Sequence, residues 1–336
     1  YMSVETAKIF FDKAVKHCKE FELDELNIGF HGGEPMLYPI KHFQIILKYF
    51  QNNADYNGIN VNFNIQTNGT LINTNYLELF KEFGVALSIS IDGNKTANDR
   101  YRLYHNNESS FNDVINGLNL VKDKTPELLV GILSVIDIRN DPIKTFDFIA
   151  KMNVHSVDFM LPLNNWENPP LRLNKEKHEY GEWYWKIYEY WINGNHSSIN
   201  IRFLTNIISQ LLGGYAIYEV MTLDPVCLLT INPDGYIEGV DTMKSSASGL
   251  QKTGMNVKTN SVKEVLNHDI VRQRQMGKLA LGNKCKKCEE LDICSGGYYP
   301  HRFSKENDFF NESVFCDDLI WLISRIRNHL DNYGKN

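Results

Sequence analysis

Four cysteines toward the C-terminal end have the residue type and spacing to bind iron or zinc. The first three form a C-x2-C-x5-C run, and the fourth follows a loop of about twenty residues: they are Cys285, Cys288, Cys294 and Cys316. Four thiolates complete one metal or iron–sulfur site, and this set would fold the loop back onto its own root. Disulfides or unligated thiols are the alternatives, but a chain of this size does not need disulfides to fold. The spacing therefore favours a cluster or zinc.

The composition sets limits on the partners. The chain has 336 residues, 43% of them hydrophobic, and a net charge of -6. It can bury one large core, or a large and a small one. The negative charge argues against nucleic acid as the main partner, and no apolar run approaches the roughly 18 residues of a membrane helix. We expect a soluble cytoplasmic protein with neither a nucleic-acid nor a membrane partner.

Strand-like and helix-like segments alternate through the first half. Amphipathic helices are predicted over residues 3–21, with Cys18 in the core, and over 40–50, 73–83, 110–121 and 142–152. The strands between them, nearly continuous apolar runs, are ELNIGF, NVNFNIQ, ALSISI, LLVGILSVI and SVDFML. Such a series predicts an α/β fold with a parallel sheet covered by helices, either open or closed into a barrel.

The strand ends are unusually polar, and parallel α/β folds place their chemistry there. TNGT at 67–70 and DG at 92–93 are each interpreted as ordinary turns. HGGEP is different, because two glycines let the backbone approach a ligand closely and a carboxylate fixed before proline suits an ammonium group. This segment consists of His31, Gly32, Gly33, Glu34 and Pro35.

Together these residues resemble the radical S-adenosylmethionine (radical SAM) enzymes, in which a GGEP segment holds the amino group of the cofactor. The four C-terminal cysteines resemble the auxiliary-cluster region called SPASM or twitch. The resemblance implies a partial (β/α)6 TIM-like barrel over 1–200 and an auxiliary-cluster domain with a C-terminal helix over 201–336. It also implies an oxidoreductase that uses S-adenosyl-L-methionine.

The auxiliary region departs from the family pattern. Relatives carry further cysteines for a second auxiliary cluster, and two of those positions here are Val240 and Tyr298. The resemblance therefore implies one auxiliary 4Fe-4S cluster on Cys285, Cys288, Cys294 and Cys316, with Cys227 a free thiol.

A second departure concerns the cluster that activates the cofactor. The family signature C-x3-C-x2-C, which binds that 4Fe-4S cluster, does not occur in this sequence. We expect the signature to lie upstream of Tyr1; the alternative is a homologue that never reduces the cofactor.

Further site residues follow from the same resemblance. His31 matches a polar residue that contacts the cofactor, Ser90 and Arg102 match groups that bind its carboxylate, and Leu163 matches a residue that packs near adenine. Each has an ordinary alternative: a strand residue for Ser90, a surface arginine for Arg102 and a core residue for Leu163.

Asp241 is the catalytic candidate. In sulfatase maturases the corresponding aspartate follows a hairpin and accepts a substrate proton, and INPDGYIEGVD ends at Asp241 here. The alternative is a turn aspartate like Asp234.

Longer segments, including DFMLPLNNWENPP and CSGGYYPHRF, resemble peptide maturases of the Xye, Grr and Fxs types. That resemblance implies a crosslink between a β-carbon and an aromatic side chain (a cyclophane) on a ribosomal precursor peptide. It also implies an electron donor such as flavodoxin or ferredoxin. Three alternatives stay open: sulfatase-maturase-like oxidation of a Cys or Ser side chain, a non-catalytic cofactor- or peptide-binding homologue, and a zinc-binding structural protein.

Overall fold

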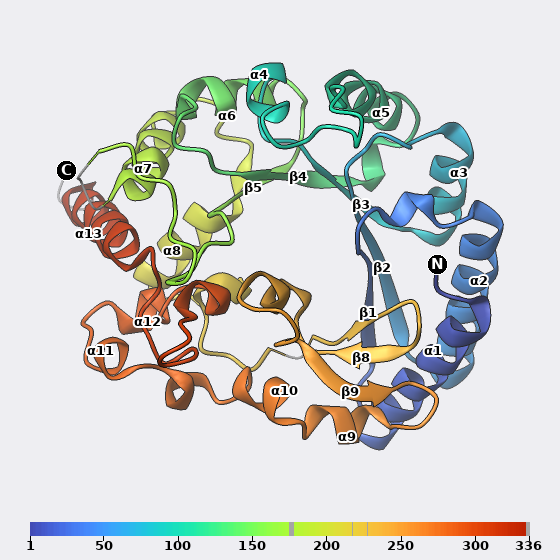
Figure 1. Ribbon diagram of the computed structural model, residues 1–336. Helices are drawn as coiled ribbons and strands as arrows, with labels where there is room; N and C mark the ends of the chain where they lie inside the picture. Colours follow the sequence, from blue (N-terminus) through green and yellow to red (C-terminus); the bar gives the residue numbers. More distant parts are fainter. Residues whose placement is uncertain (175–177, 217, 227, 334–336) are drawn as a thin grey trace. The chain divides into compact units, whose positions relative to one another are not determined.

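The computed structural model describes residues 1–174, 178–216, 218–226 and 228–333 (Figure 1). The helices are α1 Val4–Glu20, α2 Ile40–Asn57, α3 Thr74–Phe83, α4 Lys95–Asn98, α5 Phe111–Lys124, α6 Pro142–Ala150, α7 Glu179–Ile192, α8 Arg202–Leu211, α9 Val262–Leu266, α10 Asp269–Gln273, α11 Asn283–Lys286, α12 Leu291–Cys294 and α13 Cys316–Tyr333. The strands are β1 Glu25–Phe30, β2 Asn60–Thr67, β3 Ala86–Ser90, β4 Leu129–Val135, β5 Ser156–Met160, β6 Asn200–Ile201, β7 Thr230–Ile231, β8 Tyr236–Glu238 and β9 Lys252–Asn256.

Strands β1 to β6 form one six-stranded sheet in sequence order. The pairs β1–β2, β2–β3, β3–β4 and β5–β6 are parallel. A helix follows each of the first five strands, which is the usual connection between parallel neighbours. The predicted α/β fold, a partial barrel with a C-terminal cysteine-containing extension, is confirmed.

The chain divides into two compact units. Unit 1 comprises Tyr1–Leu133, Leu229–Gly239 and Lys252–Val271. Unit 2 comprises Ser134–Leu228, Val240–Gln251 and Arg272–Asn336. The domain boundary at residue 200 stays a prediction from the sequence.

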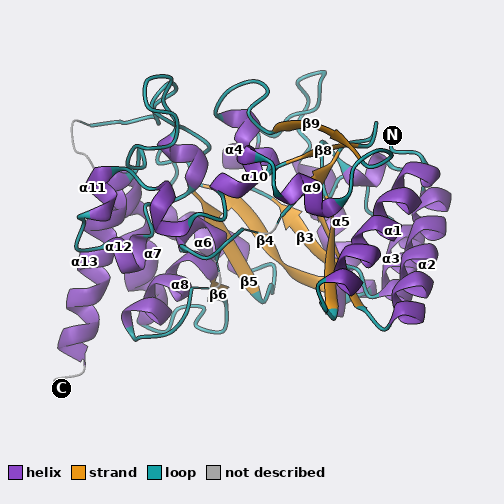
Figure 2. Cartoon of the chain, turned by 90° about the horizontal axis from the view of Figure 1, so that it is seen from below, coloured by secondary structure: helices purple, strands orange, loops and turns teal. Residues whose placement is uncertain are grey.

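In unit 1, helices α1, α2 and α3 lie side by side and cover one face of the first strands (Figures 1 and 2). Helix α1 begins after Ser3, whose hydroxyl accepts a hydrogen bond from the Thr6 amide at 3.0 Å. The ring of Phe11 in α1 stacks on that of Phe50 in α2 with centroids 4.2 Å apart, and Phe63 of β2 lies beneath Phe50. These fully apolar contacts hold the helices against the sheet.

The opposite face of the first strands is polar, which corrects one expectation. Along β2, residues Val61, Phe63 and Ile65 are buried, whereas Asn62 and Asn64 between them are exposed. Strand β2 is therefore not a continuous apolar run but alternates, with one face toward the helices and the other presenting amides. The asparagines at every second position of NVNFNIQ mark this polar face in the sequence.

The small sheet β7-β8-β9 belongs to unit 1. Its strands pair antiparallel, and the β7–β8 hairpin closes with the Gly235 amide donating to the Asn232 carbonyl at 2.8 Å. Ile237 and Val257 pack with Ile9 and Phe10 of α1. The hairpin predicted in INPDGYIEGVD is present.

In unit 2, α7 and α13 pack closely. A Cβ atom at Gly181 of α7 would lie 2.6 Å from the Asp318 carbonyl oxygen, so only glycine permits this approach. The Asp318 carboxylate accepts from the Tyr180 and Gly181 amides and pairs with Arg172. These contacts fix the first turn of α13, which begins at Cys316.

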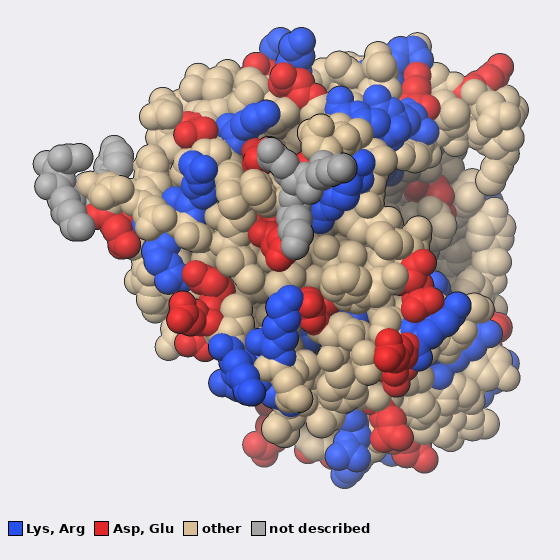
Figure 3. All heavy atoms as spheres, turned by 60° about the vertical axis from the view of Figure 1, so that its left-hand side comes forward, with Lys and Arg blue, Asp and Glu red and all other residues tan. Residues whose placement is uncertain are grey.

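None of the helices in the described residues is both long and apolar enough to span a membrane. On the face shown in Figure 3, basic and acidic side chains are interspersed.

Candidate cofactor and cluster sites

Glu34 stands at the end of β1, within the HGGEP segment. Gly32 has a backbone φ angle of 119°, which residues other than glycine rarely adopt. The Glu34 carboxylate then caps a short 3-10 helix, Pro35–Leu37, by accepting from the Met36 amide at 2.9 Å. The glycine turn and the proline thus fix where this carboxylate points.

The end of β2 holds the same carboxylate. The Thr67 hydroxyl donates to Glu34 Oε1 at 2.7 Å, and the Asn68 amide donates to Oε2 at 2.8 Å. The interpretation of TNGT as an ordinary turn is therefore incomplete, because Thr67 and Asn68 also anchor the candidate ligand group. A carboxylate has about four acceptor positions, so three hydrogen bonds leave capacity for a ligand donor.

Arg102 is positioned by Asp92, which the DG pattern predicts only as a turn residue. Its Nε and Nη2 atoms donate to the two oxygens of Asp92, at 2.6 Å and 2.9 Å. Asp92 lies two residues after the end of β3. A guanidinium group carries five donor hydrogens, and this bidentate pair uses only one of its edges. Asp92 therefore orients Arg102 and leaves its other donor hydrogens available for a ligand.

Ser90, the last residue of β3, accepts a hydrogen bond from Gln66 of β2 at 2.8 Å and is buried. His31 is exposed directly after β1. Glu34, Ser90 and Arg102 thus gather beyond the C-terminal ends of the neighbouring strands β1, β2 and β3. Leu163 belongs to unit 2, where it is partly exposed after β5.

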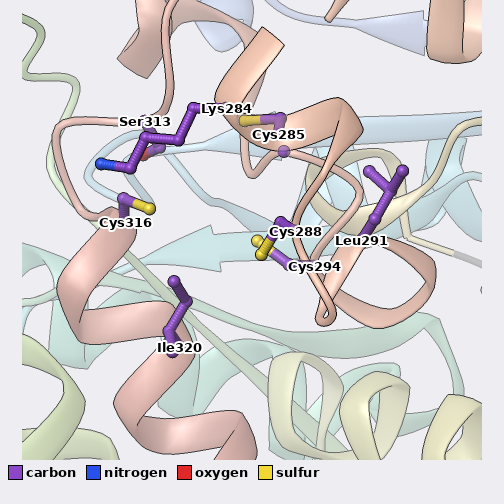
Figure 4. A pocket seen from close by; sticks show the side chains of 9 residues that line it. Lys284, Cys285, Cys288, Leu291, Cys294, Ser313, Cys316 and Ile320 are labelled. Carbon is purple, nitrogen blue, oxygen red and sulfur yellow. The ribbon is translucent and has the colours of Figure 1, made fainter. Parts of the chain in front are cut away.

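The four C-terminal cysteines surround one cavity in unit 2. Cys285 lies in α11, Cys288 follows it, Cys294 ends α12 and Cys316 begins α13. The cavity contains about 400 Å³ of empty space, part of it open to solvent, and Lys284, Gly296, Ser313 and Ile320 also line it. Figure 4 shows the sulfur atoms directed into this common space.

The state of these thiols narrows the alternatives. Cys18 and the four pocket cysteines are free, so the disulfide interpretation is wrong for the cysteines that the structure describes. Cys227 lies outside the described residues. Among the residues described, no group of three or more His, Cys, Asp or Glu is placed to hold a metal ion. One zinc ion would draw the sulfurs to about 3.8 Å from one another, given Zn–S bonds near 2.3 Å. Four thiolates can instead bind a polynuclear cluster, in which each binds a different iron.

Burial governs the acidity of the pocket thiols. It raises the pKa of Cys294 and of Cys316 to about 12, and it also raises the pKa of Cys285. Thiols in such surroundings need a compensating positive charge to become thiolates, and metal binding supplies one.

A left-handed turn forms one wall of the cavity. Ser295, Gly296 and Gly297 have φ angles of 53°, 78° and 67°. A Cβ atom at Gly296 would lie 2.7 Å from the Leu281 side chain, and one at Gly297 would lie 3.0 Å from that of Leu319. Two glycines are therefore required for the chain to pass this closely behind Cys294.

Val240 and Tyr298, which stand at the cysteine positions of relatives, are both buried. Val240 is 5% exposed and packs in an apolar cluster with Met243, Tyr299 and Phe303. The expectation of a single auxiliary cluster stays a prediction from the resemblance.

Asp241 begins a short 3-10 helix directly after Val240 and is half-buried. The neighbouring Thr242 hydroxyl lies 2.7 Å from the phenol oxygen of Tyr298. Burial, Glu219 and Asp241 contribute to raising the pKa of Tyr298 far above its ordinary value. Asp241 thus lies in a polar group beside a neutral phenol, in the same unit as the cysteine cavity.

Comparison with known proteins identifies similar chains. Residues 10–149 match the model of the Radical SAM superfamily. The cysteine-type anaerobic sulfatase-maturating enzyme of Clostridium novyi is 28% identical over 92% of this chain and 80% of that protein. A solved structure of native anSMEcpe with bound AdoMet and Kp18Cys peptide has a TM-score of 0.85 at 20% identity, covering 100% of this chain and 91% of that one. Streptococcus suis SuiB has a TM-score of 0.60 at 15% identity, covering 92% of this chain and 70% of that one.

Proposed function

We propose that this chain, a radical SAM enzyme with a SPASM-type C-terminal extension, oxidises a cysteine side chain within a peptide segment of a protein substrate. The observation that carries the proposal is the similarity to the cysteine-type sulfatase-maturating enzyme, which extends over 92% of the chain. The likeness to a relative solved with a bound peptide supports a peptide substrate.

The crosslinking reaction expected from the sequence is the second candidate. The comparisons support side-chain oxidation better, because the full-length relatives are sulfatase-maturating enzymes and the fold of SuiB is a more distant match. One observation favours crosslinking: Val240 lies in an apolar cluster where the resemblance places a second set of cluster ligands. The precursor peptide and the flavodoxin or ferredoxin donor remain predictions.

The residues at the strand ends fit S-adenosylmethionine by its charges. Glu34 would accept hydrogen bonds from the ammonium group, and Arg102, held by Asp92, would face the carboxylate with the edge that Asp92 leaves unused. Ser90 would add a hydroxyl to the carboxylate side, and Leu163 an apolar contact near adenine. His31 and the backbone of Gly32, Gly33 and Pro35 would border the same ligand.

The cysteine cavity would hold one auxiliary 4Fe-4S cluster through Cys285, Cys288, Cys294 and Cys316. When bound, the cofactor and the reduced activating cluster, which is distinct from the auxiliary cluster, supply the radical that removes a hydrogen atom from the substrate. The protein must then hold the substrate carbon near the proton acceptor and control the access of water. When the carbon radical is oxidised further it loses a proton and an electron; Asp241 would accept the proton, and the auxiliary cluster would take up the electron.

The test is product analysis with two peptides. One peptide contains cysteine in a sulfatase-like segment, and the other replaces that cysteine by alanine and retains its aromatic residues. Removal of two hydrogens from the cysteine side chain gives a thioaldehyde, which water hydrolyses to an aldehyde with release of hydrogen sulfide. A hydrazide reagent captures this aldehyde, and it forms only from the first peptide. A product from either peptide that has lost hydrogen but contains no aldehyde would instead establish crosslinking.

Replacing Asp241 by asparagine is expected to separate cofactor cleavage from product formation. The amide keeps the size of the side chain but cannot accept the proton, so product should fall about 100- to 10,000-fold, the usual contribution of an acid–base group. 5'-Deoxyadenosine should still form and be measurable by chromatography. Asp234→Asn, in the exposed hairpin turn of the same segment, is the matched control. Undiminished product from Asp241→Asn would remove this residue from the mechanism.

A further inference from the structure

Arg302 is a buried cation with no carboxylate partner among the residues that the structure describes. It is 5% exposed, and its side-chain hydrogen bonds go to three backbone carbonyls. The neighbouring Arg274, which is only partly buried, has such a partner: its Nη2 atom lies 2.6 Å from a carboxylate oxygen of Glu219. Burying a charge without an opposite charge is costly, so a negative group near Arg302 is expected.

The hydrogen bonds of Arg302 point to the wall of the cysteine cavity. Its Nε donates to the Gly296 carbonyl at 3.0 Å, and its Nη2 donates to the carbonyls of Gly297 at 2.8 Å and Ser295 at 3.2 Å. All three carbonyls belong to the left-handed turn that follows Cys294. Three successive residues with positive φ turn these carbonyls toward one guanidinium.

The guanidinium is also packed directly against that wall. A Cβ atom at Gly296 would lie 3.2 Å from Arg302 Cζ, and Gly296 itself lines the cavity. The guanidinium also lies over the ring of Tyr299, 5.4 Å from the centroid. The positive charge therefore contacts both an aromatic ring and the turn that follows Cys294.

The groups near Arg302 that would become negative when a metal binds are the cavity thiols. Arg302 interacts electrostatically with Cys285 and Cys294, which are on opposite sides of the C-x2-C-x5-C run. Burial lowers the pKa of Arg302 only to about 10, so the side chain carries its charge at neutral pH.

We infer that Arg302 is the buried counter-charge of the auxiliary cluster and sets its reduction potential. The inference rests on the proposed cluster at Cys285, Cys288, Cys294 and Cys316. A cluster held by four thiolates is negative, and reduction makes it more negative, so a nearby fixed cation favours the reduced state. Arg302 acts through the cluster and is a positioning and tuning residue, not a catalytic one.

Lys284 offers a matched comparison. It lines the same cavity, but its side chain is 62% exposed and pairs with Glu312 at 2.6 Å. Solvent and the carboxylate screen this charge, so removing it should affect the cluster less than removing the buried Arg302 charge.

The experiment is a reductive titration of the anaerobically reconstituted protein, followed by electron paramagnetic resonance. The signal that disappears in Cys288→Ala is assigned to the auxiliary cluster. Arg302→Gln is expected to lower the ratio of reduced to oxidised cluster at least tenfold at a given potential, which corresponds to a shift of about 59 mV for one electron. Arg302→Lys keeps the charge and should shift less, and Lys284→Gln should also shift less.

Iron content separates the outcomes. If Arg302→Gln folds, by circular dichroism, but loses the cluster iron that Arg302→Lys retains, the charge is required and the inference stands. An unchanged potential in Arg302→Gln, or equal iron loss in both variants, would show that Arg302 only clamps the turn. A wild-type protein without auxiliary-cluster iron would overturn the cluster proposal itself, independently of Arg302.

Discussion

Cys288→Ala is expected to lose the iron and sulfide of one whole cluster per chain. Cys288 supplies one of four thiolates around the cavity, and the remaining three would leave one iron open to solvent at the half-exposed side where Cys288 lies. Because metal binding also orders the loops that carry its ligands, the segment between Cys294 and Cys316 should become less protected from hydrogen exchange. Iron analysis, sulfide analysis and hydrogen exchange measure these effects.

The same chain provides the control for this variant. Cys18 is 2% exposed in α1 and packs in the core of unit 1, outside the cavity. Cys18→Ala should keep its full iron content and lose only about 1 kcal/mol of folding free energy, as expected for a small truncation in a core. Equal iron in Cys288→Ala and the wild type would contradict the cluster assignment. Equal loss in Cys18→Ala would show that the iron reports folding and not ligation.

Periodicity predicted most of the secondary structure because each apolar pattern is local. The strand ELNIGF coincides with β1, and the helix predicted after Ser3 is α1. The helix predicted over 40–50 continues to Asn57 as α2, since its last turns are polar and end at Gly58, which has a φ of 69°. Boundaries set by a glycine cap are less visible in an apolar pattern than the elements themselves.

The candidate sites were predictable to different depths. Cysteine spacing predicted that four thiols share one site. In the structure they line one cavity, because short turns and one returning loop join α11, α12 and the start of α13. The sequence alone does not indicate the hydrogen-bond partners of Glu34 and Arg102. Thr67, Asn68 and Asp92 are common turn residues, and only the parallel pairing of β1, β2 and β3 brings them to the charged groups that they hold. A polar residue after a strand therefore becomes informative when the neighbouring strand end carries an opposite or complementary group.

Val240 belongs to an apolar cluster that extends to the neighbourhood of the cysteine cavity. The sequence resemblance marks it as a missing cysteine, and the structure places it in an apolar cluster with Met243, Tyr299 and Phe303. A thiolate at that position would have these apolar side chains as neighbours. Tyr299 of this cluster also lies beneath Arg302, so the apolar cluster adjoins the wall of the remaining cysteine cavity. Tyr299 therefore contacts both the apolar cluster around Val240 and Arg302.

Glu34→Gln is expected to weaken S-adenosylmethionine binding by roughly 10- to 150-fold. The substitution removes the negative charge opposite the ammonium group, and a hydrogen bond to a charged group contributes about 1.5 to 3 kcal/mol. The new amide also fits its surroundings poorly, because both oxygens of Glu34 accept hydrogen bonds, from Thr67, Asn68 and Met36. Isothermal titration of the reconstituted protein with S-adenosylmethionine measures the dissociation constant.

Two further variants decide what Glu34 contributes. Thr67→Val removes one hydrogen bond to the carboxylate and keeps its charge, so it should weaken binding by only several-fold. Glu78→Gln, exposed in α3, removes an equal charge from the same unit and should leave the dissociation constant unchanged. If Thr67→Val weakens binding as much as Glu34→Gln, the carboxylate serves to join the ends of β1 and β2, and its charge is not what the cofactor meets. If Glu34→Gln binds as tightly as the wild type, the ammonium group lies elsewhere. The expected result is a large effect of Glu34→Gln and a small effect of Thr67→Val. This result would mean that the carboxylate charge contacts the ligand directly, because the affinity would then depend on that charge and not on the hydrogen bond between Thr67 and Glu34.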